Sequence, residues 1–150
     1  MNARTIALIS CVSLALTPWA QARLGESQEQ IQKRYGKPVS VNKPQGIAVY
    51  RSDGQYVRVE FAADKAAMMA YRKAPFEAMT DREIAGILAR HAGTGEWTAL
   101  PGTPGHRHWQ TADGAHIARY SVVNGLLIIT TPAYRTRQLD RKTPNWRPSR

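Results

Sequence analysis

Residues 115–131, AHIARYSVVNGLLIITT, carry the clearest structural signal in the 150-residue chain. Two segments rich in β-branched and aromatic residues flank the dipeptide Asn124-Gly125. Asn-Gly favours a two-residue type I′ turn, because both central residues of that turn need a positive φ angle. The sequence therefore predicts a β-hairpin here. The pairs expected across it are Val122 with Leu127 and Tyr120 with Ile129.

The other face of this hairpin is also apolar. A strand with one solvated face alternates apolar and polar residues, but Val123, Leu126 and Ile128 interrupt that alternation. We therefore expect either that the hairpin is covered on both faces or that these three residues form a contact surface.

A second hairpin is predicted around Asp53-Gly54, between residues 47–51 and 56–61. A two-residue turn places its apolar residues on one face. That face consists of Ala48, Tyr50, Val57, Val59 and Phe61, with Tyr50 opposite Val57 and Ala48 opposite Val59. The opposite face carries Arg51, Arg58 and Glu60, together with Ile47 and Val49.

Two structures are open for residues 66–73, AAMMAYRK. Their intrinsic propensity favours a helix. Their position directly after a hairpin and their short length before Pro75 favour a third strand, which we choose.

Two helices have clear start and stop signals. Ser27 with Gln30, and Thr80 with Glu83, form capping boxes. Gly36 and Gly93 are suited to end these helices. Residues 97–105 contain two prolines and two glycines and are predicted to be a loop. Residues 107–111 form a strand before the opening hairpin, and Pro132 begins a third, short helix with Thr131 as its cap.

This order of elements predicts a single α+β domain over residues 23–142. A helix followed by three strands occurs at about residues 24–73, and a similar order recurs at about residues 80–142. We expect two α-β-β-β units that form an antiparallel sheet layer with helices packed on one face.

The N-terminus is typical of a secretory signal peptide, over residues 1–22. A short positive segment precedes the apolar residues 6–16, and Ala20-Gln21-Ala22 has the small-x-small form of a cleavage site. Cleavage after Ala22 would deliver the protein to the periplasm or the extracellular space, with no transmembrane segment remaining. The alternative is a lipoprotein, because residues 8–11, LISC, resemble a lipobox ending in Cys11.

Catalytic chemistry has little support in the sequence. Cys11 is the only cysteine, so residues 23–150 offer no disulfide, no thiol nucleophile and no cysteine metal ligand. The sequence has no G-x-S-x-G, H-E-x-x-H, Walker or G-x-G-x-x-G motif. We expect a protein that is not an enzyme, without catalytic residues, cofactor or metal.

Three histidines lie near the predicted hairpin at Asp113-Gly114, and they could form a metal site in only one of its two possible registers. A two-residue turn at Asp113-Gly114 places His108 opposite Arg119 and sends His116 to the other face. A three-residue loop with a glycine bulge instead brings all three onto one face. We favour the first register because it gathers an apolar core. The histidines are His106, His108 and His116, and the core residues are Trp109, Ala118, Tyr120 and Val122.

The C-terminal end is strongly basic. The chain has a formal net charge of +10, and residues 135–150 contain six Arg or Lys residues and one Asp. Cations beside aromatic side chains can hold an anionic surface, and in an exported protein we expect an envelope component rather than nucleic acid. Residues 143–150 are predicted to be a disordered basic tail, because they contain too little apolar surface to bury. The alternative to binding is that this end only keeps the protein soluble. The candidate contact residues are Arg135, Arg137, Arg141, Lys142, Trp146 and Arg147.

The first unit resembles the small envelope modules of the BamE/SmpA–OmlA type. The resemblance lies in G-x-[ST], an apolar helix position, G-x-P, an aromatic strand residue and a V-x-F segment, in that order. The tandem arrangement resembles the β-lactamase inhibitory protein, and the helix starts are similar to those of other small exported bacterial proteins. The resemblance implies an exported, non-catalytic protein and transfers no functional residue. The matching positions are Leu24-Gly25-Glu26-Ser27, Ile31, Tyr35-Gly36-Lys37-Pro38, Tyr50, Val57, Val59, Phe61 and Lys65-Ala66.

From the sequence we therefore expect a protein that acts by binding or scaffolding a protein or an anionic surface. The alternative is a secreted inhibitor of another enzyme, which would need an exposed concave sheet lined with aromatic residues.

Overall fold

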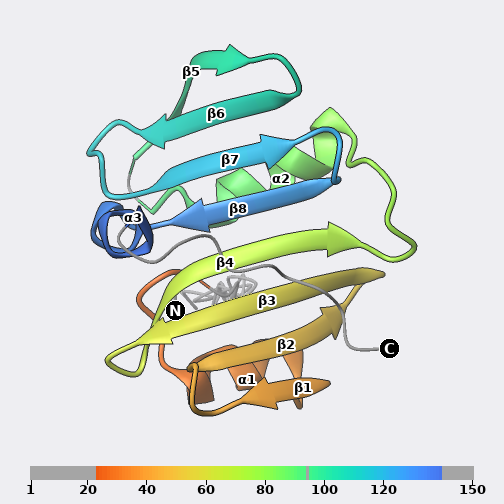
Figure 1. Cartoon of the computed structure of the whole chain (residues 1–150), viewed down its shortest axis with the longest axis vertical. Coiled ribbons are helices and arrows are strands. Elements are labelled where there is room, and N and C mark those ends of the chain that lie inside the picture. The colour runs from red at the N-terminus through yellow and green to blue at the C-terminus, as the bar shows by residue number, and fades with distance from the viewer. Residues whose placement is uncertain (1–22, 94, 140–150) are drawn as a thin grey trace, which may run out of the picture.

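The computed structural model describes residues 23–93 and 95–139, which form an α+β fold with one antiparallel sheet (Figure 1). The predicted signal peptide and residues 140–150 lie outside the described residues. Within the described part of the chain, no helix is long and apolar enough to cross a bilayer. The elements are α1 (Gln28–Tyr35), β1 (Ser40–Asn42), β2 (Ile47–Ser52), β3 (Gln55–Ala62), β4 (Lys65–Lys73), α2 (Asp81–His91), β5 (Trp97–Thr103), β6 (His106–Thr111), β7 (Ile117–Ser121), β8 (Leu126–Thr130) and α3 (Pro132–Leu139).

The strand order is β1-β2-β3-β4-β8-β7-β6-β5. Two four-stranded meanders therefore meet where β4 pairs with β8, and each meander follows one helix in the chain. Ala70 lies opposite Ile128 at the middle of this junction. The choice of a strand for residues 66–73 is confirmed, since β4 occupies that segment.

Each meander has one strand that the sequence analysis missed. The predicted loop at residues 97–105 was wrong, because β5 occupies most of it. Pro101 and Gly102 are tolerated there because β5 is an edge strand, and its pairing with β6 shifts between Leu100 and Thr103. The other missed strand, β1, is a three-residue edge strand with exposed side chains.

The register predicted for the hairpin around Asp53-Gly54 is confirmed. Tyr50 pairs with Val57, and Ala48 pairs with Val59, across the turn that contains Asp53. All four residues are buried in the core. Here the local turn chemistry and the hydrophobic pattern agree, so the sequence alone determines the pairing.

The register predicted for the opening hairpin was wrong by two residues. Tyr120 pairs with Leu127 instead of Ile129, so residues 122–125 form the connection between the strands. A shift of two residues keeps every strand residue on its predicted face, and Leu127 and Ile129 are still buried. Val122, which we predicted in the core, is 50% exposed.

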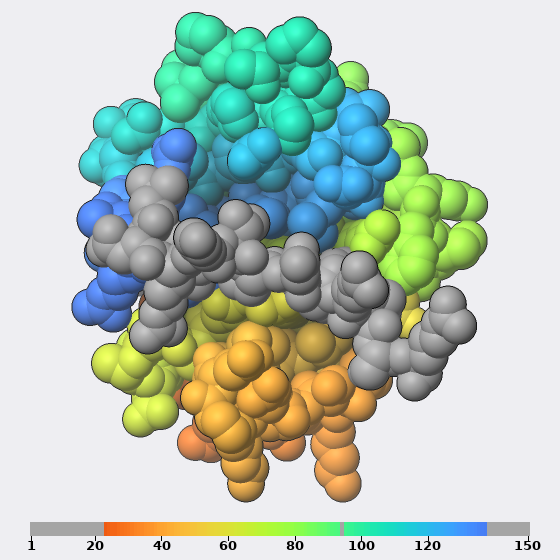
Figure 2. All heavy atoms as spheres, viewed as in Figure 1, coloured from red at the N-terminus to blue at the C-terminus, as the bar shows by residue number. Residues whose placement is uncertain are grey.

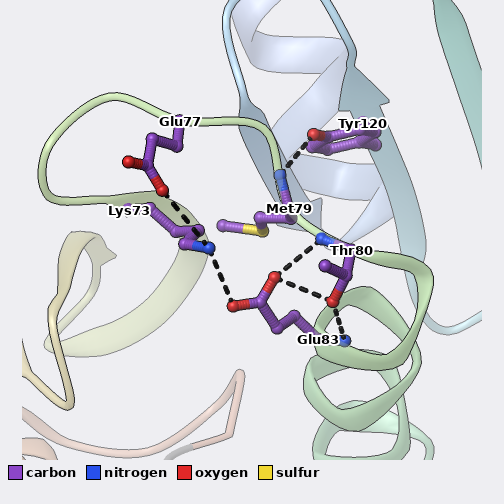
Figure 3. Close-up of polar contacts among 6 residues, drawn as sticks. All are labelled: Lys73, Glu77, Met79, Thr80, Glu83 and Tyr120. Carbon is purple, nitrogen blue, oxygen red and sulfur yellow. Dashed lines mark hydrogen bonds and ion pairs between the residues drawn. The ribbon is translucent and has the colours of Figure 1, made fainter.

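Packing against the segment between β4 and α2 accounts for this longer connection. The backbone N–H of Met79 donates a hydrogen bond of 2.8 Å to the buried hydroxyl of Tyr120 (Figure 3). Gly125 has a φ of 57°, and a Cβ at this position would lie 2.6 Å from the carbonyl oxygen of Glu77. The hairpin end thus fits closely against residues 77–79.

The same segment is tied to the start of α2. The Thr80 hydroxyl accepts a hydrogen bond from the Glu83 N–H, and the Glu83 carboxylate accepts from the Thr80 N–H (Figure 3). The Thr80 N–H and the Thr80 hydroxyl both donate hydrogen bonds to the Glu83 carboxylate, and these bonds, followed by the ammonium group of Lys73, lower the pKa of Glu83. The Nζ of Lys73 lies 3.1 Å from the Oε1 of Glu83, and this ion pair joins the end of β4 to the first turn of the helix. The capping box of α1, from Ser27 and Gln30, is present as predicted.

One face of the sheet packs against α1 and α2 and forms the core; both helices lie behind the sheet in Figure 1. Ile31 of α1 and Ile84, Ile87 and Leu88 of α2 are buried. The third helix departs from the prediction, because the hydroxyl of Tyr134 on α3 donates to a residue of the other face. The sheet contributes Ala48, Tyr50, Val57, Val59, Met69, Tyr71, Trp109, Ala118, Tyr120, Leu127 and Ile129 to the core.

The close approach at Gly125 gives a stability prediction. Gly54→Ala is the matched control, because Gly54 also has a positive φ, 72°, but a Cβ added there would meet nothing within 4 Å. Gly54→Ala should lower the free energy of unfolding by about 1–2 kcal/mol through backbone strain alone. Gly125→Ala should lower it by about 1–3 kcal/mol more, because the backbone at Glu77 must also shift.

Urea unfolding of both variants measures the difference. Equal losses of stability would show that residues 77–79 do not pack against the hairpin end as described.

Candidate functional site

The face of the sheet that points away from the core is the candidate site; we call it the second face. Successive side chains of a strand point to opposite faces, so alternate residues of β2–β8 meet on it. A hollow of about 970 Å³ lies over this face, lined by residues from seven strands and from α3. Figure 2 shows this face in space-filling form, with the strands of the first meander below and those of the second above.

A single row of residues in register crosses the second face at the hollow. Each residue lies opposite the next on the neighbouring strand, where Cβ atoms are about 4.5–5.5 Å apart. The row places an apolar centre, at the β4–β8 junction, between two arginines. From β2 to β5 it consists of Val49, Arg58, Ala70, Ile128, Arg119, His108 and Leu100.

Apolar residues also form much of the floor on either side of this central row. Met68 lines the hollow beside Ala70 on β4, and Leu126 lines it beside Ile128 on β8. The prediction that Leu126 and Ile128 form an apolar second surface is thus consistent with their position in the hollow. Val123, which we grouped with them, lies in the β7–β8 connection and is 83% exposed.

The charges at the hollow are unequal. Among the described residues that line it, four are arginines and one, Glu60, is a carboxylate. Glu60 is buried; it forms an ion pair of 2.5 Å with Arg58 and accepts a hydrogen bond from Tyr134. Its charge is therefore compensated by Arg58 on the same strand. The arginines are Arg58, Arg72, Arg119 and Arg135.

The remaining arginines differ in their surroundings. The guanidinium of Arg72 lies 3.9 Å from the ring centroid of Phe76, a cation–π geometry. Arg119 and Arg135 are exposed, and neither forms an ion pair with another described residue. Two arginines at the hollow thus keep charges that no described carboxylate compensates.

The three candidate histidines do not come together. His108 pairs with Arg119, which confirms the favoured register. The rings of His106 and His108 stack with centroids 6.5 Å apart on the second face. His116 instead lies beside α2, with its Nδ1 2.8 Å from the carbonyl oxygen of His91 and its ring stacked on Trp97. Among the described residues, no group of three or more His, Cys, Asp or Glu side chains could hold a metal ion.

A histidine with a strongly lowered pKa lies in the core. His91 is fully buried, and its Nε2 lies 2.7 Å from the hydroxyl of Tyr71. Burial, followed by the positive potential of His116, Arg90 and Arg23, lowers the pKa of His91 to about 3. His91 lies in the last turn of α2, where a histidine is ordinarily an exposed cation beside the C-terminal end of the helix dipole. The available signal of its burial is helical spacing, because Leu88 and Ile87 precede His91 by three and four residues and share its face of the helix.

Only part of the predicted basic contact segment is described. Arg135 and Arg137 are exposed on α3, and Arg135 lines the hollow. The segment therefore contributes one described residue to the second face. The other candidates, Arg141, Lys142, Trp146 and Arg147, lie outside the described residues.

Comparisons with known proteins add no functional assignment. No protein-family model matches the chain, and no curated protein matches it. Among solved structures, the chain is similar to a 1.5 Å crystal structure of an extracellular protein containing an SCP domain from Bacillus anthracis str. Ames. The identity is 11% and the TM-score is 0.44, and the match covers 99% of this chain and 57% of that chain. A similarity at this level carries no argument about function.

The buried His91 predicts a steep loss of stability in acid. Below the ordinary pKa of 6.5, the unfolded chain binds a proton at this histidine, whereas the folded chain does so only near pH 3. The free energy of unfolding should therefore fall as the pH drops from about 6.5 towards 3, by up to about 1.4 kcal/mol per pH unit from this residue.

His91→Gln removes the titrating group and should flatten this dependence. Thermal unfolding between pH 7 and pH 4 measures it, with His106→Gln on the second face as the matched control. If His91→Gln and the wild-type protein lose stability in parallel, the burial of a neutral His91 is contradicted.

Proposed function

We propose that this protein is a small exported, non-catalytic binding protein, and that the second face around the hollow is its contact surface. The observation that carries the proposal is the composition of the central row. Apolar residues at the β4–β8 junction form the floor of the hollow, which seven strands line, and cationic side chains lie on either side of them. A contiguous apolar surface bordered by polar groups is typical of an interaction site.

The distribution of perturbed pKa values supports binding rather than catalysis. Catalytic groups usually combine a shifted pKa with a position in a cleft. The shifted pKa values belong to Tyr35, Tyr50, Tyr71, Glu83, His91 and Asp113, and these six residues lie outside the lining of the hollow. Tyr71 and His91 are buried in the core on the helix side of the sheet.

We also propose that the two meanders are two related units, each built of a helix and the strands that follow it. The mirrored strand order supports this interpretation, because β3 and β7 occupy corresponding places. Arg58 on β3 and Arg119 on β7 then take corresponding positions on either side of the junction. The resemblance to tandem α-β modules is the basis for the exported location, together with the predicted signal peptide at residues 1–22.

Inhibition of another enzyme is the second candidate, suggested by the tandem arrangement of the units. Among the described residues, the tyrosines at the hollow are Tyr56 and Tyr134, and no tryptophan or phenylalanine lines it. Trp109 and Tyr120, by contrast, are buried in the core. The second face thus offers mainly aliphatic and cationic contacts, which favours the more general binding function.

Pull-down from a bacterial envelope extract tests the contact surface. The immobilised protein is compared with Ile128→Glu, which places a charge at the centre of the second face, and with Arg82→Glu, which changes an exposed residue of α2. We expect the wild-type protein and Arg82→Glu to retain the same component. Ile128→Glu should retain at least about tenfold less of it, because the introduced carboxylate removes apolar contact at the centre of the surface and competes with the partner for Arg119, its cross-strand neighbour.

Circular dichroism and thermal unfolding establish that each variant is folded. Equal retention by folded Ile128→Glu and wild-type protein would place the contact surface elsewhere.

A further inference from the structure

We propose that the hollow binds an anionic amphiphile, a molecule with one flexible apolar chain and a carboxylate or phosphate head group. This inference rests on the proposed function and specifies the ligand of the same surface. The apolar floor, the uncompensated cations and the size of the hollow support it.

The β4–β8 junction supplies the site for the apolar chain. Ala70 and Ile128 lie directly opposite each other there, and Met68 and Leu126 line the hollow beside them. Alanine has no side-chain atom beyond Cβ, so the floor is lowest at Ala70. An alkyl chain on this floor is removed from water, and the favourable free energy increases with each CH₂ group that is buried.

Arg119 supplies the site for the head group. It lies directly opposite Ile128 on the neighbouring strand, so its guanidinium borders the apolar centre. It is exposed and has no ion-pair partner among the described residues. A guanidinium presents paired N–H donors that match a carboxylate or phosphate, and such charge-assisted hydrogen bonds are stronger than neutral ones.

The neighbouring groups leave this cation available. Glu60 is already bound by Arg58 and Tyr134, on the far side of the junction from Arg119. His108, the other cross-strand neighbour of Arg119, stacks on His106 and brings no negative charge. An anionic head group is therefore the complement that this part of the hollow lacks.

The size of the hollow favours a small flexible ligand. Its volume of about 970 Å³ lies within the range of small-molecule sites, which is about 300–1,000 Å³. The central row crosses seven strands, so it extends over about 29 Å at a strand spacing of about 4.8 Å. A flexible alkyl chain can follow such a long, shallow floor, whereas a rigid compact ligand would contact only part of it.

Four probes with the same twelve-carbon chain test the charge requirement. Dodecyl phosphate and dodecanoate are anionic, dodecyltrimethylammonium is cationic and dodecyl maltoside is uncharged. Isothermal titration of the full protein below the micelle concentrations should show saturable binding of the anionic probes, at least about tenfold tighter than of the other two. Equal binding of all four probes, or no saturable binding of any, would overturn the proposal.

Three variants test the location. Arg119→Gln should weaken the binding of dodecyl phosphate about tenfold and leave dodecyl maltoside unchanged, and Arg119→Lys should restore part of the loss. Ile128→Thr, a modest change that keeps the β-branched shape, should weaken all probes that bind. Arg82→Gln on α2 and Val39→Thr before β1 are the matched controls for charge and for apolar surface, and both should bind as the wild-type protein does.

The outcomes separate this inference from the proposed function. If binding does not depend on the head group but is weakened by Ile128→Thr, the second face remains the contact surface, and the proposal that its ligand is an anionic amphiphile is contradicted. If dodecyl phosphate binds and neither Arg119→Gln nor Ile128→Thr weakens it, both the ligand site and the proposed contact surface are wrong. If polyglutamate displaces dodecyl phosphate at equal charge concentration, an acidic protein is the better partner and the amphiphile is overturned.

Discussion

The pairing of β4 with β8 is the interaction on which the rest of the structure depends. It joins two meanders that are each made of neighbouring strands, and it is the one strand pairing between them in the described chain. On the core face it places Met69 beside Ile129 and Tyr71 beside Leu127, all fully or almost fully buried. On the second face it brings Ala70 against Ile128. The five residue pairs between β4 and β8 therefore contribute side chains to both the core and the candidate site.

The two faces of this junction differ in how they are covered, because the described helices are short and two of them pack on the core face. α1 and α2 each bury an apolar stripe against the core face. The described chain has α3 as its remaining helix, and α3 lies near the hollow rather than across it, since Tyr134 contacts Glu60 and Arg135 is a lining residue. The second face keeps an apolar centre although strand alternation would ordinarily place polar residues there. That departure from the usual pattern is the physical reason to regard it as a binding surface.

Local signals predicted the local structure well. Capping residues at Ser27 and Thr80 determine helix starts through hydrogen bonds within four residues, so the sequence shows them directly. The Asp53-Gly54 turn likewise specified its hairpin. At Asn124-Gly125 the same reasoning failed, because Gly125 fits against the backbone of Glu77, a segment distant in sequence. A preference worth about a kilocalorie per mole is readily overridden by such packing.

The candidate site could be predicted only in its parts. The alternation of β8 showed that Leu126 and Ile128 share an apolar face, and the first hairpin showed Arg58 and Glu60 on the face opposite the core. No local pattern brings these residues together, because their neighbourhood depends on the strand order across β3, β4, β8 and β7. The edge strand β5, which adds Leu100 to the row, was hidden by its proline and glycine.

The comparison of β3 with β7 shows why the charge of the second face is uneven. Arg58 is followed two residues later, on the same face, by Glu60, and the two side chains form an ion pair. Arg119 is followed at the corresponding position by Ser121, which carries no charge. One half of the sheet therefore compensates its arginine internally, whereas the other half does not. A buried pair contributes little to net stability and offers no charge to a ligand, but an exposed guanidinium beside an apolar surface can bind an anion at little desolvation cost. Under the proposed function, this difference between β3 and β7 favours Arg119, in the second meander, as the cation that binds the partner.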